Sequence, residues 1–458
     1  MINKNLKIYL ILFITTLVFA GGSVGFLSYK AKTSPVPNAK LYPASGLGAG
    51  GVTMDNYVMT KNLVEHRVFS RDLEAPFEPD TWRTPGYPFF AAIFYYIFSS
   101  FYPVLFFQII LLFFTSVLIF KMAEKMMDSN WAILPVLLYI ILPTTLLTTS
   151  ALFTENPFVF TLVAAFYFFL FSDFKNLYTK ALLCGFLLAI SAYIRPASFY
   201  LLFLFVPAYL IVYLRREEIN RKQFIAVGLL ILIFLATLAP WYLRNKKETG
   251  VYVLFRQNAA QFYSGLHNVS TLEGRDALLE MAGLPKGMVP RDTTHSEIMK
   301  KVAIQVISEH PFKYALFHFS TLIPFFTSSG ANEYGRFVHD MLPDYNPAPE
   351  PSLLQALHPF SLPLLIVVLK NHGWTLVENA LWAIITLFVF LSLWKSKNVR
   401  LSRIFFVIII YFAAVTGPIA HARYRIPVEP FMLLMAFSFL NTIYSEYKEK
   451  GFNILKKY

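Results

Sequence analysis

Charged side chains are scarce in this chain of 458 residues. They make up 15% of the sequence, whereas 56% of the residues are hydrophobic and 17% are aromatic. A soluble domain carries about a quarter charged residues. The apolar residues form continuous blocks long enough to cross a hydrocarbon core, which takes roughly 20 helical residues. Continuous blocks indicate helices rather than a closed barrel. The sequence therefore predicts an all-α polytopic membrane protein.

Cysteine is nearly absent as well. The one cysteine, Cys184, lies within an apolar segment, so no disulfide can form within the chain. The nine histidines are scattered and show no Cys/His spacing of the kind that binds zinc. The sequence also shows no internal repeat, which argues against a transporter built from two related halves.

Positive charge, by contrast, is in excess. The chain has 40 Lys and Arg against 27 Asp and Glu, a net charge of +13. These basic residues flank the apolar blocks, so they indicate anchoring at a membrane surface and not a nucleic-acid partner. The most basic short loops, 214–223 and 395–403, and the C-terminal tail are expected on the cytoplasmic side. The first apolar segment is too long for a typical signal peptide, so we interpret it as a retained helix.

Counting outward from these loops gives ten spans, with both termini cytoplasmic. The apolar stretch 87–98 breaks the alternation, and 12 residues span only about 18 Å. We therefore expect a juxtamembrane helix at the outer surface. The two short apolar pieces 314–326 and 362–369 would raise the count to twelve if they crossed as a hairpin.

Three regions follow from this topology. Residues 1–241 form a membrane module with an outer loop at 29–101, residues 242–374 a variable outer region, and residues 375–458 the last spans and a cytoplasmic tail.

Polar residues recur at the predicted outer ends of the spans. For each one a simpler interpretation exists: the acids could begin helices, and the arginines could extend along the lipid to reach water. Outer arginines nevertheless run against the inward bias of positive charge, most clearly in His421-Ala422-Arg423-Tyr424-Arg425. The candidate residues are Asp55, Tyr57, Arg83, Tyr87, Glu155, Arg195, Arg244, His421, Arg423, Tyr424 and Arg425.

Carboxylates and guanidinium groups on one membrane surface suit chemistry on a phosphate-linked lipid. A guanidinium group matches phosphate oxygens in pairs and stays charged, while a carboxylate can accept the proton of an attacking hydroxyl. A sugar carried on a polyprenyl phosphate needs both groups, one for the departing phosphate and one for the acceptor.

The order of these motifs resembles that of bacterial GT-C glycosyltransferases. The motifs are an Asp on the first outer loop, Arg-Thr-Pro-Gly-Tyr-Pro, Thr-Glu, Ile-Arg-Pro, Pro-Trp-Tyr-Leu-Arg-Asn and His-Ala-Arg-Tyr-Arg. The chain is most similar to the family-39 type, which is related to protein O-mannosyltransferases and lipid A aminoarabinose transferases. The resemblance covers residues 1 to about 250 and returns at 404–440.

The resemblance implies a fold and a set of roles. It implies a GT-C-like bundle of 10–12 transmembrane helices with juxtamembrane helices in the first outer loop. Asp55 then falls at the catalytic carboxylate and Glu155 at the second acidic position. Donor phosphate binding falls to Arg83, Arg195, Arg244, Arg423 and Arg425.

The resemblance bears less clearly on a cofactor. Many relatives carry paired acids where Asp55 is followed by Asn56. A tightly bound metal is therefore not expected. A divalent cation such as Mg²⁺ or Mn²⁺ could still bridge Asp55 and Glu155, but weakly.

The expected function is an inverting transfer of a hexose or pentose from a polyprenyl-phosphate donor to an unidentified envelope acceptor. Protein, lipid and polysaccharide all remain open as the acceptor. The site would lie on the outer face of the cytoplasmic membrane. A flippase or transporter of lipid-linked saccharides is the alternative, but it predicts polar residues at the membrane midplane, which the spans lack. A third alternative, a membrane scaffold, leaves the outer acids and arginines unexplained.

Overall fold

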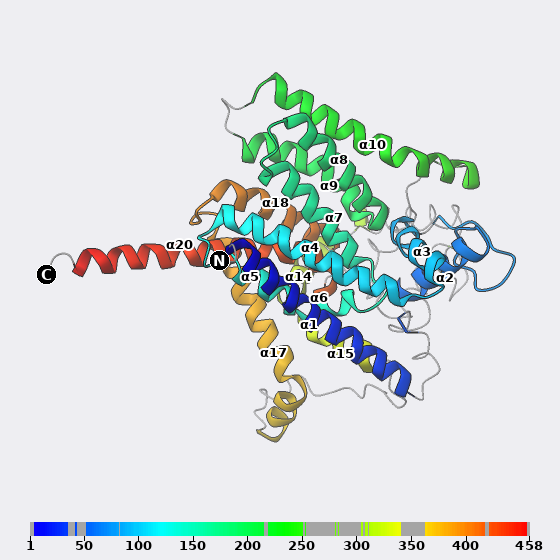
Figure 1. The fold of residues 1–458 in the computed structure, drawn as a ribbon, viewed down its shortest axis with the longest axis horizontal. Helices are drawn as coiled ribbons and strands as arrows, with labels where there is room; N and C mark the ends of the chain where they lie inside the picture. The colour runs from blue at the N-terminus through cyan, green and yellow to red at the C-terminus, as the bar shows by residue number, and fades with distance from the viewer. Residues whose placement is uncertain are drawn as a thin grey trace.

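The fold is helical throughout the part of the chain that the structure describes (Figure 1). The structure is a computed structural model. It describes residues 4–34, 42–43, 52–81, 83–214, 219–250, 311–339, 362–416 and 421–455, with a few isolated residues between 252 and 309. Trp82, Arg215, Arg216, most of 258–308 and all of 343–361, on which parts of the sequence prediction rest, lie outside the described residues.

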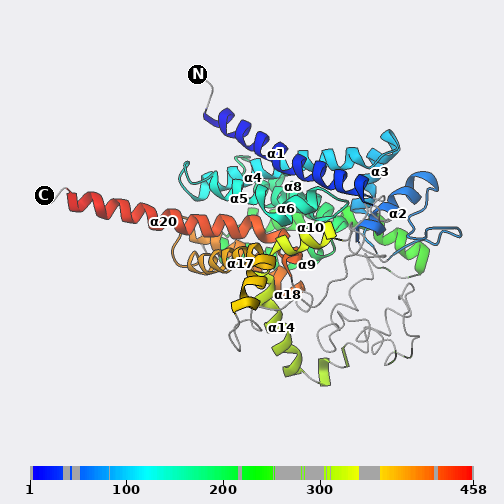
Figure 2. The same cartoon turned by 90° about the horizontal axis from the view of Figure 1, so that it is seen from below.

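Seven helices among the described residues are long and apolar enough to cross a membrane. They are α1 (Lys4–Thr33), α4 (Tyr102–Met126), α8 (Leu177–Ile194), α10 (Arg221–Thr249), α17 (Leu362–Leu391), α18 (Val399–Thr416) and α20 (Glu429–Leu455). Figure 2 shows α20 running from the centre of this bundle to a free C-terminal end. The helical, membrane-spanning architecture expected from the sequence is confirmed.

The other expected spans are shorter or interrupted. Residues 131–150, expected as one span, form α5 (Leu134–Ile141) and α6 (Pro143–Thr149). The break falls at Pro143, which has no backbone N–H to continue the hydrogen bonding of α5. Two further helices end in a π-helical turn: α7 (Glu155–Phe166) continues into η2 (Tyr167–Phe171), and α9 (Ala197–Ala208) into η3 (Tyr209–Tyr213).

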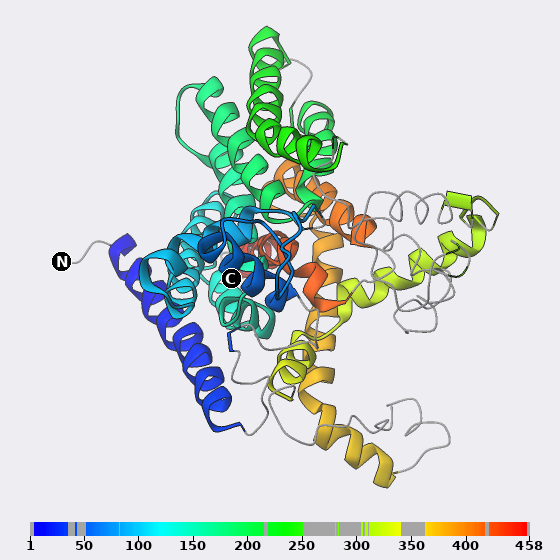
Figure 3. The same ribbon diagram turned by 90° about the vertical axis from the view of Figure 1, so that its right-hand side faces the viewer.

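The short helix expected at 87–98 is present as α3 (Gly86–Phe98). It packs against α2 (Val52–Glu65) at the end of the bundle where α4 begins and α8 ends (Figures 1 and 3). Its outer side is apolar and exposed, with Ile93 59% and Ile97 63% accessible. An exposed apolar stripe on a helix of this length fits a position along a membrane surface.

The two short apolar pieces of the C-terminal half do not form a matched hairpin. The first is α14 (Pro311–Thr327), which is followed at once by α15 (Gly330–His339). The second, 362–369, is the beginning of α17 and not a separate piece. The chain then passes through α18 and the short helix α19 (Ala422–Arg425) into a 3₁₀ turn, η6 (Ile426–Val428), before α20.

Candidate functional site

Asp55 and Arg83, expected from the sequence to share a surface, form an ion pair. Asp55 stands in the first turn of α2, and Arg83 lies in the turn before α3. Arg83 donates to Asp55 Oδ2 from Nε at 2.8 Å, and its Nη2 lies 2.6 Å from the same oxygen. Both contacts go to the same oxygen, and within the described residues Oδ1 accepts no hydrogen bond. Asp55 therefore keeps one carboxylate oxygen for another partner.

A folded loop behind this pair holds Arg83 in position. Asp80 accepts the backbone N–H of Arg83 on Oδ1 at 2.9 Å and pairs with Arg71 through Oδ2. Its backbone carbonyl accepts Arg244 Nη1 at 2.7 Å. Asp80 was not among the candidates, and its only signal in the sequence is its place three residues before Arg83.

Arg244, expected as a phosphate ligand, supports this loop. Its guanidinium group lies over the ring of Trp241 at 4.8 Å and over Phe69 at 5.6 Å. Arginine stacks on aromatic rings in this way when its charge is partly removed from water.

Glu155 forms a second acid–arginine cluster. Its side chain is fully buried at the start of α7 and meets two arginines through the same oxygen, Oε1. Arg195 Nη1 lies 3.1 Å from it, and Arg423 Nε donates to it. Arg195 sits over the ring of Phe158 at 5.7 Å, and Arg423 over Phe153 at 4.8 Å. One carboxylate thus faces two guanidinium groups, so these three side chains together carry a net charge of about +1.

One nitrogen of this cluster has no aligned acceptor. Arg195 Nη1 is buried, yet it makes no hydrogen bond of good geometry within the described part of the chain. The side-chain oxygen of Asn156, next to Glu155, is likewise buried without a hydrogen bond there. Buried polar groups of native proteins normally have partners. Unmatched groups beside a charged cluster therefore mark a place where a ligand could bind.

Three contacts join the two clusters at one end of the bundle. Asn56, the residue after Asp55, donates to the carbonyl of Leu152 at 2.8 Å, three residues before Glu155. Thr84, next to Arg83, donates to the carbonyl of Ile194 at 3.1 Å, one residue before Arg195.

Gly86 makes the third contact. A Cβ there would lie 2.6 Å from the carbonyl carbon of Tyr193, so only glycine permits this approach of α3 to the end of α8.

The aromatic and histidine candidates lie around these clusters and not between them. Tyr87 is fully buried and donates to Gln108 Oε1 at 2.8 Å, so it belongs to the packing of α3 on α4. Tyr57 packs its ring 4.8 Å from Phe101. His421 stands edge-on to the ring of Tyr424 at 4.8 Å.

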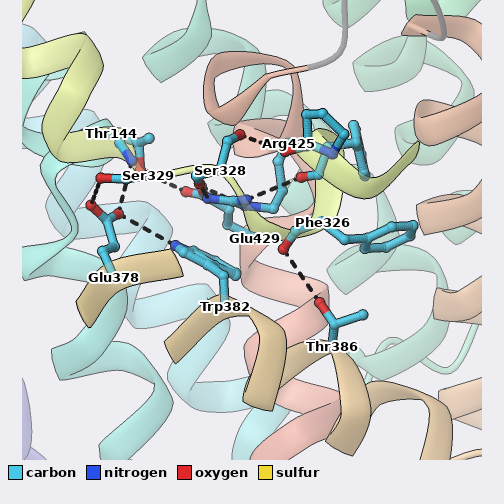
Figure 4. A network of polar contacts seen from close by, with 12 residues as sticks. Thr144, Phe326, Ser328, Ser329, Glu378, Trp382, Thr386, Arg425 and Glu429 are labelled. Atoms are coloured by element: carbon cyan, nitrogen blue, oxygen red, sulfur yellow. Dashed lines mark hydrogen bonds and ion pairs between the residues drawn. The ribbon is translucent and has the colours of Figure 1, made fainter. Parts of the chain in front are cut away.

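Arg425 lies in a different place from the other arginines. Its side chain is fully buried in the network of Figure 4. It donates to the carbonyls of Phe325 at 3.0 Å and Ser328 at 2.9 Å and to Glu429 Oε1 at 3.3 Å. The geometry does not bring it to the Glu155 cluster, because residues two apart in a helix do not share a face.

An apolar groove of about 330 Å³ lies between α9 and α10, beside Arg244. Its lining is almost free of polar atoms. The residues that line it are Phe199, Leu235, Leu238, Ala239, Tyr242, Leu243 and Tyr252.

The donor set of the two clusters fits a metal poorly. Within the described residues no group of three or more His, Cys, Asp or Glu side chains comes together. The carboxylate of Glu155 meets two guanidinium groups, and that of Asp55 meets one. A divalent cation in either place would have to displace or adjoin an arginine.

Comparison with known proteins supports the family resemblance. Residues 82–242 match the family model described as dolichyl-phosphate-mannose-protein mannosyltransferase. This range contains Arg83, Glu155 and Arg195, whereas Asp55 and Arg423 lie outside it. Among curated proteins none matches the sequence.

Solved structures share the fold. The oligosaccharyltransferase of Archaeoglobus fulgidus matches with a TM-score of 0.52 at 12% identity, over 98% of this chain and 52% of that protein. The present chain therefore spans about half the length of that relative. ArnT from Cupriavidus metallidurans, solved with undecaprenyl phosphate, matches with a TM-score of 0.42 at 10% identity, over 95% of this chain and 77% of that one. The match to the Archaeoglobus fulgidus structure and the match to the family model confirm the GT-C fold expected from the sequence.

Proposed function

We propose that the protein is a membrane glycosyltransferase that moves a sugar from a polyprenyl-phosphate donor to a hydroxyl group of an envelope acceptor. The observation that carries this proposal is the meeting of Asp55–Arg83 and Glu155–Arg195–Arg423 at one end of the bundle. The match of residues 82–242 to a family named for a lipid-phosphate sugar donor supports it.

Asp55 is the proposed base. Its Oδ1 would accept the proton of the acceptor hydroxyl, and the hydroxyl oxygen would form a bond to the anomeric carbon of the sugar. The bond from that carbon to the phosphate oxygen breaks, and the polyprenyl phosphate leaves with the electron pair. Attack opposite to the leaving group inverts the configuration. Arg83 orients the base through its Nε hydrogen bond and its Nη2 ion-pair contact to Oδ2.

The Glu155 cluster is the proposed phosphate site. Its two arginines outnumber its carboxylate, so the phosphate would meet an uncompensated positive charge. Arg195 Nη1 would gain the acceptor that it lacks among the described residues. Glu155 itself would sit close enough to shield the positive charge that develops on the sugar.

The groove between α9 and α10 fits the lipid part of such a donor. Arg195 lies two residues before the first residue of α9, and Phe199, in the first turn of that helix, lines the groove. A polyprenyl chain lying there would place its phosphate at the cluster end of both helices. The groove is apolar and faces the surroundings of the bundle, as binding of an isoprenoid requires.

We further propose that this end of the bundle faces outward from the cytoplasmic membrane, with both termini inside. A cysteine in place of Leu73, which is 73% exposed in the loop between α2 and α3, should react with a membrane-impermeant reagent from outside. A cysteine in place of Lys397, between α17 and α18, should react only after permeabilisation. The native Cys184 is buried and gives no background. The reverse labelling pattern would contradict this orientation.

The test of the activity is turnover in liposomes. Purified protein should consume a polyprenyl-phosphate sugar with a labelled sugar, releasing polyprenyl phosphate and labelling a hydroxyl acceptor. A flippase would change the leaflet of the labelled lipid and leave it intact. Relocation without consumption would therefore contradict the proposal.

A further inference from the structure

The turn between α14 and α15 is fixed by two buried charges of opposite sign (Figure 4). Arg425 donates to the carbonyl of Phe325 in the last turn of α14 and to that of Ser328, the residue after this helix. Glu378 of α17 binds the first N–H groups of α15, those of Gly330 at 3.0 Å and Ala331 at 2.8 Å. A cation at a helix C-terminus and an anion at an N-terminus both match the helix dipole. The direction in which α15 leaves the turn is therefore strongly specified.

The same turn leaves no free space on its inner side. A Cβ at Gly330 would lie 2.4 Å from Thr144 Cγ2, so the start of α15 rests directly on α6. Thr144 in turn donates to Glu429 Oε2 at 2.9 Å, and Arg425 lies 3.7 Å over the ring of Trp382. These contacts join α6, α15, α17 and α20 into one unit around the turn.

Beyond this turn, α15 contacts both segments of the chain that carry the Glu155–Arg423 pair. Phe337 is fully buried, and its ring lies 5.9 Å from that of Phe153, two residues before Glu155. Phe153 is also the ring over which Arg423 lies. On the other side, Glu333 Oε1 lies 3.2 Å from Nδ1 of His421, two residues before Arg423.

The environment of Glu333 suits a charged partner of His421. Its side chain is 12% exposed. Burial acts to raise the pKa of Glu333, but its contact with His421 and the charges of Arg336 and Arg423 outweigh burial and lower the pKa. Nδ1 of His421 is buried and makes no hydrogen bond of good geometry within the described residues, so the Glu333 carboxylate at 3.2 Å is its partner through charge. Glu333 lies one turn inside α15, so its position follows from the fixed turn.

We propose that Glu333 is a positioning residue of the transfer reaction: α15 holds the segment 421–423 through His421, and thereby holds Arg423 against Glu155. This inference rests on the proposed function, because it assigns to a helix outside residues 82–242 the task of aligning the phosphate site. Misplacement of a catalytic group by about 1 Å can slow a reaction about a hundredfold.

The test compares Glu333→Gln, Glu333→Asp, His421→Gln and the double variant Glu333→Gln/His421→Gln in the liposome assay. We expect Glu333→Gln to lower kcat about tenfold with a smaller change in donor KM, and Glu333→Asp to recover part of the loss. The double variant should be no slower than the slower single variant, because both break one link. Glu309→Gln, on an exposed residue upstream of α14, is the matched control and should leave turnover unchanged.

Two results would overturn the inference: wild-type turnover by Glu333→Gln, or losses that multiply in the double variant. If the wild-type protein shows no turnover, the proposed function is refuted. The thermal unfolding midpoints of the same four variants then test the link between Glu333 and His421 separately. If α15 holds the 421–423 segment, the shifts of the two single variants are not additive. Additive shifts in that case would refute the link between Glu333 and His421.

Discussion

Arg423 and Arg425 are two residues apart, yet they serve two regions of the molecule that differ in kind. Arg423 faces Glu155 in a cluster with more guanidinium groups than carboxylates and with a buried nitrogen lacking an aligned acceptor. Arg425 faces Glu429 in a network where its nitrogens bind two carbonyls and a carboxylate. An excess of guanidinium groups with a buried nitrogen that lacks an aligned acceptor fits binding of an anion, whereas a guanidinium group whose Nε, Nη1 and Nη2 all donate to protein oxygens fits support.

The same contrast holds for the carboxylates. Asp55 uses one oxygen for Arg83, and its side chain is 13% exposed. Glu429 uses both oxygens, for Arg425 and Thr144, and is fully buried. A reacting group must reach solvent or substrate, so Asp55 is the better candidate for chemistry. Four experiments would sharpen or break this division between a reactive region and a supporting one.

The largest effect is expected from Asp55→Asn. Asparagine keeps the size of the side chain and begins a helix nearly as well as aspartate, but it cannot accept the proton. Loss of a general base lowers the rate by about 10²–10⁴-fold. We expect a folded, inserted protein with little turnover in the liposome assay. Turnover at the wild-type rate would make Asp55 structural and leave Glu155 as the next candidate for the base.

Arg425→Met should act on stability instead. It leaves Glu429 buried without its charged partner, which destabilises a protein by about 3–5 kcal/mol. The thermal unfolding midpoint in detergent should fall sharply, and Arg425→Met/Glu429→Gln should recover part of the fall. Lys395→Met is the control, because its pair with Glu446 is about 40% exposed on both sides and such pairs contribute roughly 0–1 kcal/mol. Loss of turnover at unchanged stability would move Arg425 into the reactive region.

The sequence brought most residues of the Asp55 and Glu155 clusters to attention as candidates, but it gave little indication of the supporting network around Arg425. Hydropathy locates helices because a span must be apolar along its whole length, so even the short helix 87–98 could be recognised. The arginines at the predicted outer ends of the spans stood out because they violate the bias of positive charge toward the inside. The acids stood out because ionisable residues are rare beside apolar segments. The supporting network has no such signal: Arg425 binds Phe325 from 100 positions away in the chain. Only packing reveals that partnership.

The sequence also misplaced residues 362–369, which were expected as a short separate apolar piece and are the beginning of α17. A run of eight apolar residues followed by Lys370, Asn371 and His372 reads as a short separate piece. The structure carries α17 straight through these polar residues. Hydropathy measures how apolar a segment is, but it does not show where a helix ends. Gly373, which follows these polar residues, is accommodated inside α17 and does not end it.

Arg83→Lys should have a moderate effect. Lysine keeps the charge but loses the planar guanidinium group, whose Nε donates to Asp55 Oδ2 while Nη2 lies 2.6 Å from the same oxygen. Losing one charge-assisted hydrogen bond, about 1.5 kcal/mol, corresponds to about a tenfold fall in kcat. Arg403→Lys, on an exposed residue of α18, is the matched control. A change confined to donor KM would show that Arg83 binds the phosphate directly and does not orient the base.

The smallest effect is expected from chelation. Each acid of the site already has an arginine partner, and the described residues offer no cluster of three metal ligands. A weakly held Mg²⁺ or Mn²⁺ would require a carboxylate oxygen that is free of guanidinium. Within the described residues these are Oδ1 of Asp55 and Oε2 of Glu155, which accepts from the Thr154 hydroxyl. Turnover after EDTA treatment should therefore change by less than about twofold, and added Mg²⁺ should restore any loss. If activity instead tracks stoichiometric zinc through purification, the reactive region includes a ligand set beyond these acids, and the roles given to Asp55 and Glu155 would have to be reassigned.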